Sequence, residues 1–301
     1  MADFVALCRT FVRVAEAGSF TAAALDRGAA QPTVSRRIAR LEEHLGTLLI
    51  RRTTRAHTLT DDGRRFLDAA RTVLDAVAAA EAAVGRRAAA PSGTVRLACP
   101  VVLGRLHVLP RLPLFLARHP GVAVDLLMSD GFADLVEQGI DLAIRVGEID
   151  DPGLIARRIG TTRRVAVAAP GYLAARGEPA DPRDLAGHDC VVYSRLATGD
   201  VWEFTGPDGP IRVPIRGRIR VDNSEGVREA VLAGLGIGLM PQWHFPGGPE
   251  AAGLRVVLRA FTPAALPTHA VYATRRFVPA KVRVLLDFLA EAFAGEATLA
   301  G

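Results

Sequence analysis

The spacing of apolar residues changes once along this chain, at a run of small residues over positions 88–93 that ends in Pro91, Ser92 and Gly93. Before this run, apolar residues recur every three or four positions, which is typical of amphipathic helices. After it, short apolar runs alternate with helical stretches, which is typical of a parallel sheet covered by helices. The sequence therefore predicts a helical N-terminal part and an α/β C-terminal part, with a boundary at the small residues.

Apolar residues at helical spacing predict three N-terminal helices, over residues 2–17, 21–27 and 33–45. A glycine follows each of them, and glycine commonly ends a helix because it readily adopts a left-handed backbone conformation. Pro32 stands where the first turn of the third helix tolerates a proline. Short apolar segments at residues 48–52 and 57–59 then predict two strands of a β-hairpin wing.

The positive charge of the chain is concentrated at its N-terminal end. Residues 1–90 hold 14 Lys and Arg against 10 Asp and Glu, whereas the remaining residues hold 23 against 22. A local excess of positive charge attracts polyanions, and a helix-turn-helix pair places its second helix in the major groove of DNA. Double-stranded DNA is therefore the first partner to expect, and a purely structural helical bundle is the alternative.

Candidate DNA-binding residues follow from this placement of the third helix. Polar side chains near its start suit base edges and phosphates, and the arginines that follow can contact guanine or phosphate. Arginines of the wing have the reach for a phosphate or a narrow minor groove. The candidates are Thr21, Gln31, Pro32, Thr33, Ser35, Arg36, Arg37, Arg40, Arg52 and Arg55. For Arg40, an ion pair with Glu42 or Glu43 is an equally favoured alternative.

A long helix is predicted over residues 60–88. About 29 residues at about 1.5 Å each would span roughly 43 Å. Its apolar residues are spaced alternately by four and three positions, which forms a heptad seam. The seam residues are Phe66, Ala70, Val73, Val77, Ala80 and Val84. Because nothing nearby in the sequence is expected to cover this seam, we favour pairing with a second copy of the chain over packing on its own domain.

The C-terminal part predicts two α/β lobes. Strands are expected at residues 95–99, 122–128, 142–146, 164–168, 190–193, 219–221, 237–240 and 271–274. Helices are expected at residues 104–118, 132–138, 225–233 and 282–294. The last strand and helix are expected to return to the first lobe, so that two crossings join the lobes. Ligands bind such sheets at the carboxyl ends of their strands, which predicts a binding cleft between the lobes.

The sequence also disfavours several classes of protein. Charges interrupt the apolar stretches and no basic and apolar leader begins the chain, so we expect a cytoplasmic protein that contacts no membrane. A solute-binding protein would need such a leader and would leave residues 1–90 without a role. No Gly-x-Ser-x-Gly or paired metal motif supports an enzyme, and no cofactor is expected. The three cysteines predict unpaired thiols, with Cys99 as an oxidation sensor the less favoured alternative to unreactive burial.

Ordered motifs in the N-terminal part resemble the DNA-binding region of LysR-type transcriptional regulators. They are GSFTAAA at residues 18–24, QPTVSRRI at 31–38 and LTDDG at 59–63. The resemblance continues through LPLF at 112–115, DLAIR at 141–145, DLAGH at 184–188 and AGLGI at 233–237. It implies a winged helix-turn-helix joined to an α/β effector domain similar to type 2 periplasmic binding proteins. The function it implies is sequence-specific transcription regulation under the control of a small molecule.

The resemblance also assigns the parts of the chain. Residues 1–60 form the winged helix-turn-helix domain, 61–90 the linker and dimerisation helix, 91–295 the effector domain and 296–301 a tail. Lobe I covers about residues 93–162 and 268–295, and lobe II about 163–267. One recognition helix per subunit predicts a dimer on an interrupted palindrome. By resemblance, dimers assemble into tetramers, and RNA polymerase is a further candidate partner.

The effector is expected between the lobes, near residues that come from different strand ends. These are Pro100, Val101, Val102, Arg145, Tyr193, Ser194, Asn223, Ser224 and Met240. The helix after Asn223 should offer free N–H groups to an anion and Arg145 should point to the same place, which predicts a small organic carboxylate. An internal ion pair of Arg145 with Asp141 or Glu148 is the alternative.

Two positions depart from the family pattern. Ala30 stands where relatives usually have Ser or Thr before the third helix, which removes a side-chain cap worth about 1 kcal/mol. Pro100, Val101 and Val102 stand where relatives commonly place a hydroxyl group that holds the ligand. The second departure favours an aromatic or branched carboxylate over a sugar acid.

Overall fold

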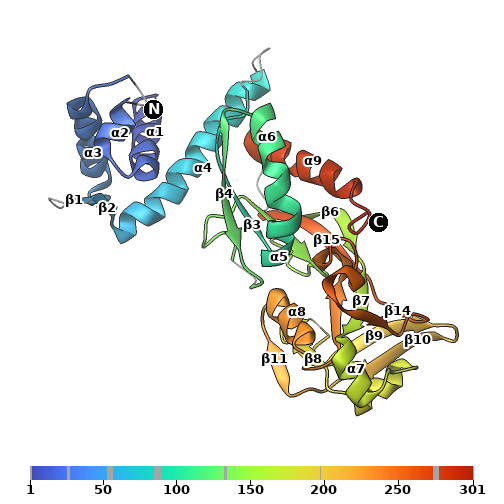
Figure 1. The fold of residues 1–301 in the computed structure, drawn as a ribbon. Coiled ribbons are helices and arrows are strands. Elements are labelled where there is room, and N and C mark those ends of the chain that lie inside the picture. Colours follow the sequence, from blue (N-terminus) through green and yellow to red (C-terminus); the bar gives the residue numbers. More distant parts are fainter. Residues whose placement is uncertain are drawn as a thin grey trace. The chain divides into compact units, whose positions relative to one another are not determined.

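The computed structural model describes residues 2–25, 28–52, 57–84, 90–131, 134–196, 198–273 and 278–300. The chain forms two compact units, drawn in Figure 1. The N-terminal unit holds residues 1–89, together with the short segment 277–279. The C-terminal unit holds residues 90–276 and 280–301.

The N-terminal unit begins with three helices and a small hairpin. Its elements are α1 (Ala2–Ala17), α2 (Phe20–Leu25), α3 (Gln31–Leu45), β1 (Ile50–Arg52) and β2 (His57–Leu59). The glycines that follow the helices, Gly18, Gly28 and Gly46, all have positive φ angles, of 63°, 57° and 68°. Residues with a side chain rarely adopt this conformation, which explains why α1 and α3 end at the predicted residues, Ala17 and Leu45. The second helix is described to Leu25, and the last two residues of its predicted range lie outside the described residues.

Packing rather than capping holds α3 in place. Ala30 contributes no side-chain cap, as its sequence requires, and Pro32 lies in the first turn. Val34, Ile38 and Leu41 are each at most 1% exposed and lie in the core of the unit. A side-chain cap stabilises a helix by about 1 kcal/mol, whereas burial of each of the three apolar side chains contributes roughly 1.5–3 kcal/mol. The loss of the cap is therefore the smaller effect.

Glycine is required where the next helix begins. Thr60 accepts the N–H of Gly63 on its hydroxyl oxygen at 2.9 Å and donates that hydroxyl to the carbonyl of Leu48 at 2.6 Å. A Cβ atom at Gly63 would lie 2.0 Å from the carbonyl oxygen of Leu49. Any side chain there would force the hairpin and the helix apart.

The long helix α4 (Asp61–Val84) corrects part of the predicted seam. Ala70 is 1% exposed and the Phe66 ring lies 5.4 Å from that of Phe11, so both pack in the core of their own unit. The expectation that nothing local covers the seam is wrong for these two residues. Val73 is 38% exposed, Val77 is half-buried and Ala80 is exposed. The side chain of Val84 and residues 85–89 lie outside the described part of the chain.

The first lobe of the C-terminal unit is built on a five-stranded sheet of order β4-β3-β5-β15-β6. The strands are β3 (Gly93–Cys99), β4 (Val122–Met128), β5 (Leu142–Val146), β6 (Leu154–Thr162) and β15 (Leu266–Ala273). β3 is parallel to β4 and β5, whereas β15 is antiparallel to β5 and β6. The prediction of a parallel sheet is therefore wrong at β15, the strand on which the chain returns from the second lobe and which lies between β5 and β6.

Two predicted helices of the first lobe differ in the structure. The helical stretch begins earlier than predicted, with α5 (Val101–Leu103). The segment predicted as one helix at 104–118 then divides into a π-helical turn (Gly104–Val108), a 3-10 turn (Leu109–Arg111) and α6 (Leu112–Arg118). The prolines near its middle cannot donate the N–H that an unbroken helix needs. The helix predicted at 132–138 is wrong in its described part, because residues 135–139 are a turn held by the carboxylate of Asp134.

The C-terminal end of the chain packs against the first lobe. α9 (Ala280–Ala294) buries Leu285 and Leu289, and the predicted return to this lobe is confirmed. The six residues expected as a tail are not loose in their described part, since Leu299 is 0% exposed. The carbonyl of Leu299 also accepts the N–H of Thr161 at 2.7 Å.

The second lobe consists of three small sheets around one core. Their strand orders are β12-β7-β13, β11-β8 and β10-β9-β14. The elements are β7 (Arg164–Ala168), α7 (Pro170–Arg176), β8 (Val191–Tyr193), β9 (Val201–Gly206), β10 (Gly209–Pro214), β11 (Ile219–Val221), α8 (Ser224–Leu232), β12 (Gly238–Pro241), β13 (Arg255–Val257) and β14 (Thr262–Pro263). Val167, Trp202 and Phe204 lie at the centre of the core. No helix among the described residues is long and apolar enough to cross a membrane.

Candidate DNA-binding helix and interlobe site

The predicted recognition helix α3 has one buried and one accessible face. Its apolar residues turn into the core, while Gln31, Pro32, Arg36, Arg37 and Arg40 are exposed. Thr33 and Ser35 are partly exposed, and Thr21 is exposed on α2. The candidates of the two helices are thus accessible to a partner. The side chain of Arg52 and the whole of Arg55 lie outside the described residues.

The partner of Arg40 differs from the predicted one. Its guanidinium lies 2.7 Å from the carboxylate of Asp3, and the two side chains are 67% and 56% exposed. Glu42 instead accepts the N–H groups of Leu49 and Ile50 at 2.9 and 3.0 Å, which ties the end of α3 to the hairpin. An exposed ion pair contributes less than about 1 kcal/mol, so Arg40 can exchange Asp3 for a phosphate at little cost.

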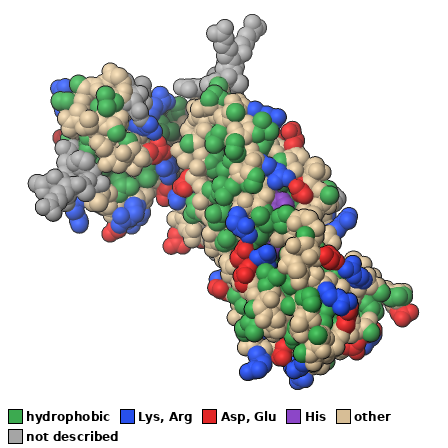
Figure 2. Space-filling model, viewed as in Figure 1, with side chains coloured by type: hydrophobic (Ala, Val, Ile, Leu, Met, Phe, Trp, Pro, Cys, Tyr) green, Lys and Arg blue, Asp and Glu red, His purple; other side chains and the backbone are tan. Residues whose placement is uncertain are grey.

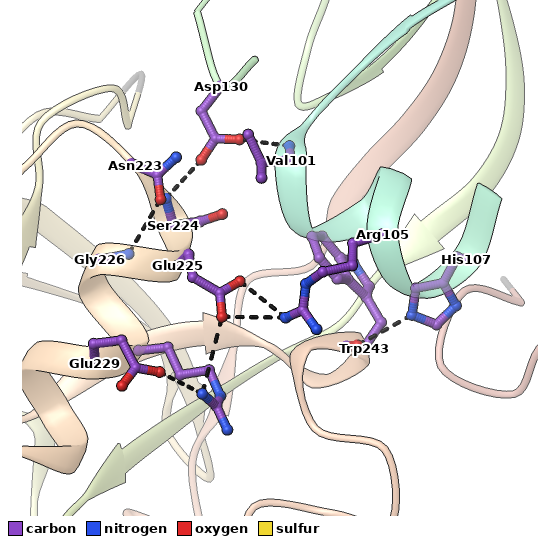
Figure 3. Close-up of polar contacts among 11 residues, drawn as sticks. Val101, Arg105, His107, Asp130, Asn223, Ser224, Glu225, Gly226, Glu229 and Trp243 are labelled. Atoms are coloured by element: carbon purple, nitrogen blue, oxygen red, sulfur yellow. Dashed lines mark hydrogen bonds and ion pairs between the residues drawn. The ribbon is translucent and has the colours of Figure 1, made fainter. Parts of the chain in front are cut away.

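A single carboxylate connects the two lobes of the C-terminal unit (Figure 3). Asp130 follows β4 in the first lobe, and one of its oxygens accepts the N–H of Val101, also of the first lobe, at 2.9 Å. The other oxygen accepts the N–H of Ser224, the first residue of α8 in the second lobe, at 2.6 Å. We call these three residues the interlobe site.

Two backbone N–H groups at the start of α8, those of Ser224 and Gly226, are therefore occupied, where the sequence led us to expect groups free for a ligand. Asp130 takes that of Ser224, and the side chain of Asn223 accepts that of Gly226 at 3.1 Å. The hydroxyl oxygen of Ser224 is buried and has no hydrogen-bond partner within the described residues. Asp130, which accepts the N–H of the same residue, does not pair with this hydroxyl.

A second polar contact joins the lobes beside the first (Figure 3). Arg105, in the π-helical turn of the first lobe, donates to both carboxylate oxygens of Glu225 on α8, at 3.1 and 3.0 Å. Such a contact to both oxygens fixes the orientation of the pair as well as adding attraction. With Arg105 half exposed, it remains open to solvent screening.

The other predicted effector residues differ in how far their side chains are exposed. Tyr193 is partly buried, and its pKa is raised to about 12 by burial and then by the charge of Asp130. Pro100 and Val101 are partly exposed, and Ser194 is exposed with its hydroxyl donated to the carbonyl of Val221. Val102 and Met240 are 0% and 1% exposed, so their side chains are not accessible to a ligand in this conformation.

Acidic residues act on the charge of Arg145 within the first lobe. Burial lowers the pKa of its guanidinium, while the charges of Asp151 and Asp134 act in the opposite direction. Asp141, one of the acids given as an example of an ion-pair partner, accepts the backbone N–H of Arg96 at 3.0 Å. The positive charge of Arg145 is thus partly compensated inside the first lobe.

Buried histidines lie between the lobes but carry no charge at neutral pH. His107 contacts the carbonyl of Trp243 at 3.1 Å, and burial lowers its pKa. His244 is 2% exposed, and burial, followed by the charges of Arg228 and Arg105, lowers its pKa to about 3. In both rings, burial favours the neutral form of the imidazole.

Burial also disfavours the reactive thiolate form of Cys99 and Cys190. Cys99 and Cys190 are 3% and 1% exposed, and burial raises the pKa of each to about 12. Because the thiolate is the reactive form, this favours unreactive burial over an oxidation sensor at Cys99. No cluster of three potential metal ligands occurs within the described ranges.

Asp130 was not among the residues singled out from the sequence, nor were Arg105 and Glu225. The available signal for Asp130 is its place just beyond the carboxyl end of β4, the edge at which α/β sheets bind ligands. Its partners lie 29 and 94 residues away, and no local pattern predicts such a pairing. Figure 2 shows acidic and basic side chains interspersed over the visible face of this unit, so charge alone does not mark the site.

Two family models match the chain. "Bacterial regulatory helix-turn-helix protein, lysR family" matches residues 5–64, and "LysR substrate binding domain" matches residues 88–294. The transcriptional regulator PtxR of Pseudomonas aeruginosa is 37% identical over 284 residues, covering 93% of this chain and 90% of that protein.

Solved structures agree with these matches. CrgA of Neisseria meningitidis, a LysR-type transcriptional regulator, is similar with a TM-score of 0.60 and 32% identity, covering 95% of this chain and 97% of that one. The virulence activator AphB of Vibrio cholerae is similar with a TM-score of 0.59 and 29% identity, covering 95% and 98%.

Proposed function

Because the chain belongs to the LysR family of transcriptional regulators, we propose that it binds promoter DNA as a dimer or tetramer and responds to a small organic carboxylate held between its lobes. The chain is a regulator with a DNA-binding domain and an effector-binding domain, and its relatives are not enzymes. The proposal divides it into residues 1–60 for DNA binding, 61–90 for dimerisation and 91–295 for effector binding.

The division of α3 into two faces is the observation that carries the DNA-binding part. Three apolar residues hold the helix in the core, and the side chains suited to bases and phosphates remain outside. One such helix per subunit fits one half of an interrupted palindrome in the major groove. Arg52 and Arg55 of the wing would add phosphate or minor-groove contacts, and RNA polymerase is a further proposed partner at the promoter. This activity belongs in the cytoplasm.

The effector class is supported by the hydrogen-bonding groups between the lobes. The N–H groups of Val101 and Ser224 already bind a carboxylate, that of Asp130, and two donors that suit one carboxylate suit another. A partly apolar surround at Pro100 and Val101 favours an aromatic or branched acid over a sugar acid. A ligand that binds both lobes changes their relation only if its affinity differs between two arrangements.

Screening small carboxylates by thermal shift tests this effector class. We expect a specific acid to raise the melting temperature of the intact chain, and the same acid to change its affinity for a promoter fragment. Ser224→Ala and Arg145→Ala should abolish the shift, whereas Arg157→Ala should leave it unchanged because Arg157 pairs with Asp287 away from the interlobe site. If the rise in melting temperature persists in both Ser224→Ala and Arg145→Ala, the effector binds at another place. If no acid of the panel raises the melting temperature, small carboxylates are rejected as the effector class.

A further inference from the structure

The carboxylate of Asp130 is bound like a ligand. It accepts one N–H group from each lobe, at 2.9 and 2.6 Å, and the second belongs to the first residue of the nine-residue helix α8. Hydrogen bonds from N–H groups to an ionised carboxylate are about twice as strong as neutral ones, and the start of a helix further favours a negative charge. The interlobe site therefore binds a carboxylate, and in this structure the carboxylate is the protein's own.

We infer that Asp130 is an internal ligand of a carboxylate site formed by the N–H groups of Val101 and Ser224, and that an external carboxylate binds there by displacing it. The second half of this inference rests on the proposed carboxylate effector. Each N–H group has one hydrogen to donate, and two carboxylates a few ångströms apart repel each other. Asp130 and an effector carboxylate are therefore mutually exclusive at these two donors.

One group of the site gives an external ligand an advantage over Asp130. The hydroxyl of Ser224 is buried and has no partner in the described parts of the chain, so its hydrogen-bonding capacity is unused while Asp130 is bound. A buried polar group without a partner destabilises the folded chain, because it has lost its hydrogen bonds to water without gaining others. An incoming carboxylate that accepts both the N–H and the hydroxyl of Ser224 removes this destabilisation.

A displaced Asp130 has a positive charge nearby. The guanidinium of Arg195 lies beside the next residue, Gly131, with its Nη1 atom 3.6 Å from where a Cβ would stand. Arg195 is already paired with the exposed Asp222 at 3.3 Å. Asp130 can thus leave the N–H groups without being buried as an unpaired charge.

The consequence is a threshold on effector binding. A ligand whose site is open for only a fraction of the time binds with an affinity reduced by that fraction. If Asp130 occupies the site for nine-tenths of the time, its removal should lower the half-maximal effector concentration about tenfold. Removal should also weaken the connection between the lobes, because one side chain makes both contacts.

Acetate is a direct probe, since it carries the same carboxylate as the Asp130 side chain. In the intact chain with Asp130→Ala, we expect sodium acetate to raise the melting temperature saturably, by about 2–4 °C at a few times its dissociation constant. Wild type should show no such shift in the same range. Sodium chloride at equal ionic strength and neutral acetamide should not reproduce it.

Asp125→Ala is the matched control, because it removes the same charge from an exposed ion pair with Arg96 on the first lobe and touches neither the two N–H groups nor Arg195. Equal acetate shifts in wild type, Asp130→Ala and Asp125→Ala, or no shift in any, would overturn the inference. If Asp130→Ala does not fold, Asp130→Asn serves instead. It keeps the side-chain size but has one acceptor oxygen, so acetate should stabilise it more than wild type, and equal responses would overturn the inference.

The outcome separates this inference from the proposed effector class. An acetate response confined to the Asp130 variants supports the internal ligand even if no acid in the wider panel stabilises wild type, in which case the effector class alone fails. A carboxylate hit on wild type whose half-maximal concentration is unchanged by Asp130→Ala would support the effector class and overturn displacement.

Discussion

Arg36 illustrates what a single residue contributes to the proposed DNA recognition. It lies on α3 two residues beyond the buried Val34 and is exposed. Its side chain has the length and the donor geometry to reach the edge of a guanine in the major groove.

We expect Arg36→Ala to weaken binding to a specific promoter site by about 1–3 kcal/mol and to flatten discrimination at one base position. Arg13→Ala is the matched control, since Arg13 is a partly exposed arginine on α1 rather than on α3. Gel-shift titrations against specific and scrambled duplexes measure both quantities. Unchanged affinity would remove Arg36 from the interface, and an equal loss on both duplexes would restrict it to a phosphate.

The residues of α3 and those of the interlobe site show how far the role of a single residue can be predicted from the sequence. Val34 and Ile38 could be assigned to the core because helical periodicity is a local property, and both are at most 1% exposed. Asp130 could not be assigned, because its role depends on N–H groups brought to it by folding. Glu42 shows the same limit, since it binds the hairpin rather than the neighbouring arginine.

Among the elements, α4 carries the proposed dimer contact. Phe66 and Ala70 at its start belong to the core of the N-terminal unit, whereas Val73 is 38% exposed and Val77 is only half-buried. Periodicity identifies an apolar stripe but does not say which partner covers each turn of it. The part of the seam available to a second chain therefore begins at Val73.

Replacing both Val73 and Val77 by Asp should produce a monomer with much weaker DNA binding, because the change would bury unpaired charge in the interface. The matched control is Thr72→Asp with Ala76→Asp, which adds the same two charges at the same spacing on exposed positions outside the seam. Light scattering at a fixed protein concentration distinguishes the two. A double Val73 and Val77 variant that is still dimeric would exclude this stretch of α4 as the contact.

Some strands and helices could not be predicted from the sequence, because their apolar residues do not follow a regular spacing. β6 places Arg157 and Arg158 in the middle of a strand, and its pairing with β15 shifts register between Arg158 and Gly160, so its alternation is broken. Gly160 is required there, because a Cβ would lie 2.6 Å from the carbonyl oxygen of Leu299. Pro110, which lies between α5 and α6, and Pro113, in the first turn of α6, likewise interrupt a segment whose apolar spacing predicts one helix.

In the molecule as a whole, the division into a helical and an α/β unit follows from the change in apolar spacing at residues 88–93. The strand order of the first lobe does not, because the antiparallel return of β15 between β5 and β6 is a tertiary property. The connection of the lobes through Asp130 and through Arg105 with Glu225 is equally non-local. Regulation by an effector therefore depends on contacts that are visible only in the folded chain.

The central claim is that two copies of the chain read two inverted half-sites in DNA. The most direct measurement is a fluorescence-anisotropy titration of a promoter duplex, selected from genomic fragments by the intact protein, against the same duplex with one half-site scrambled. We expect the intact duplex to bind about a hundredfold more tightly, with two chains per duplex, because the second contact is intramolecular once the first is made. Both affinities should fall steeply with salt. Equal affinity for the two duplexes, or one chain bound to each, would contradict the account.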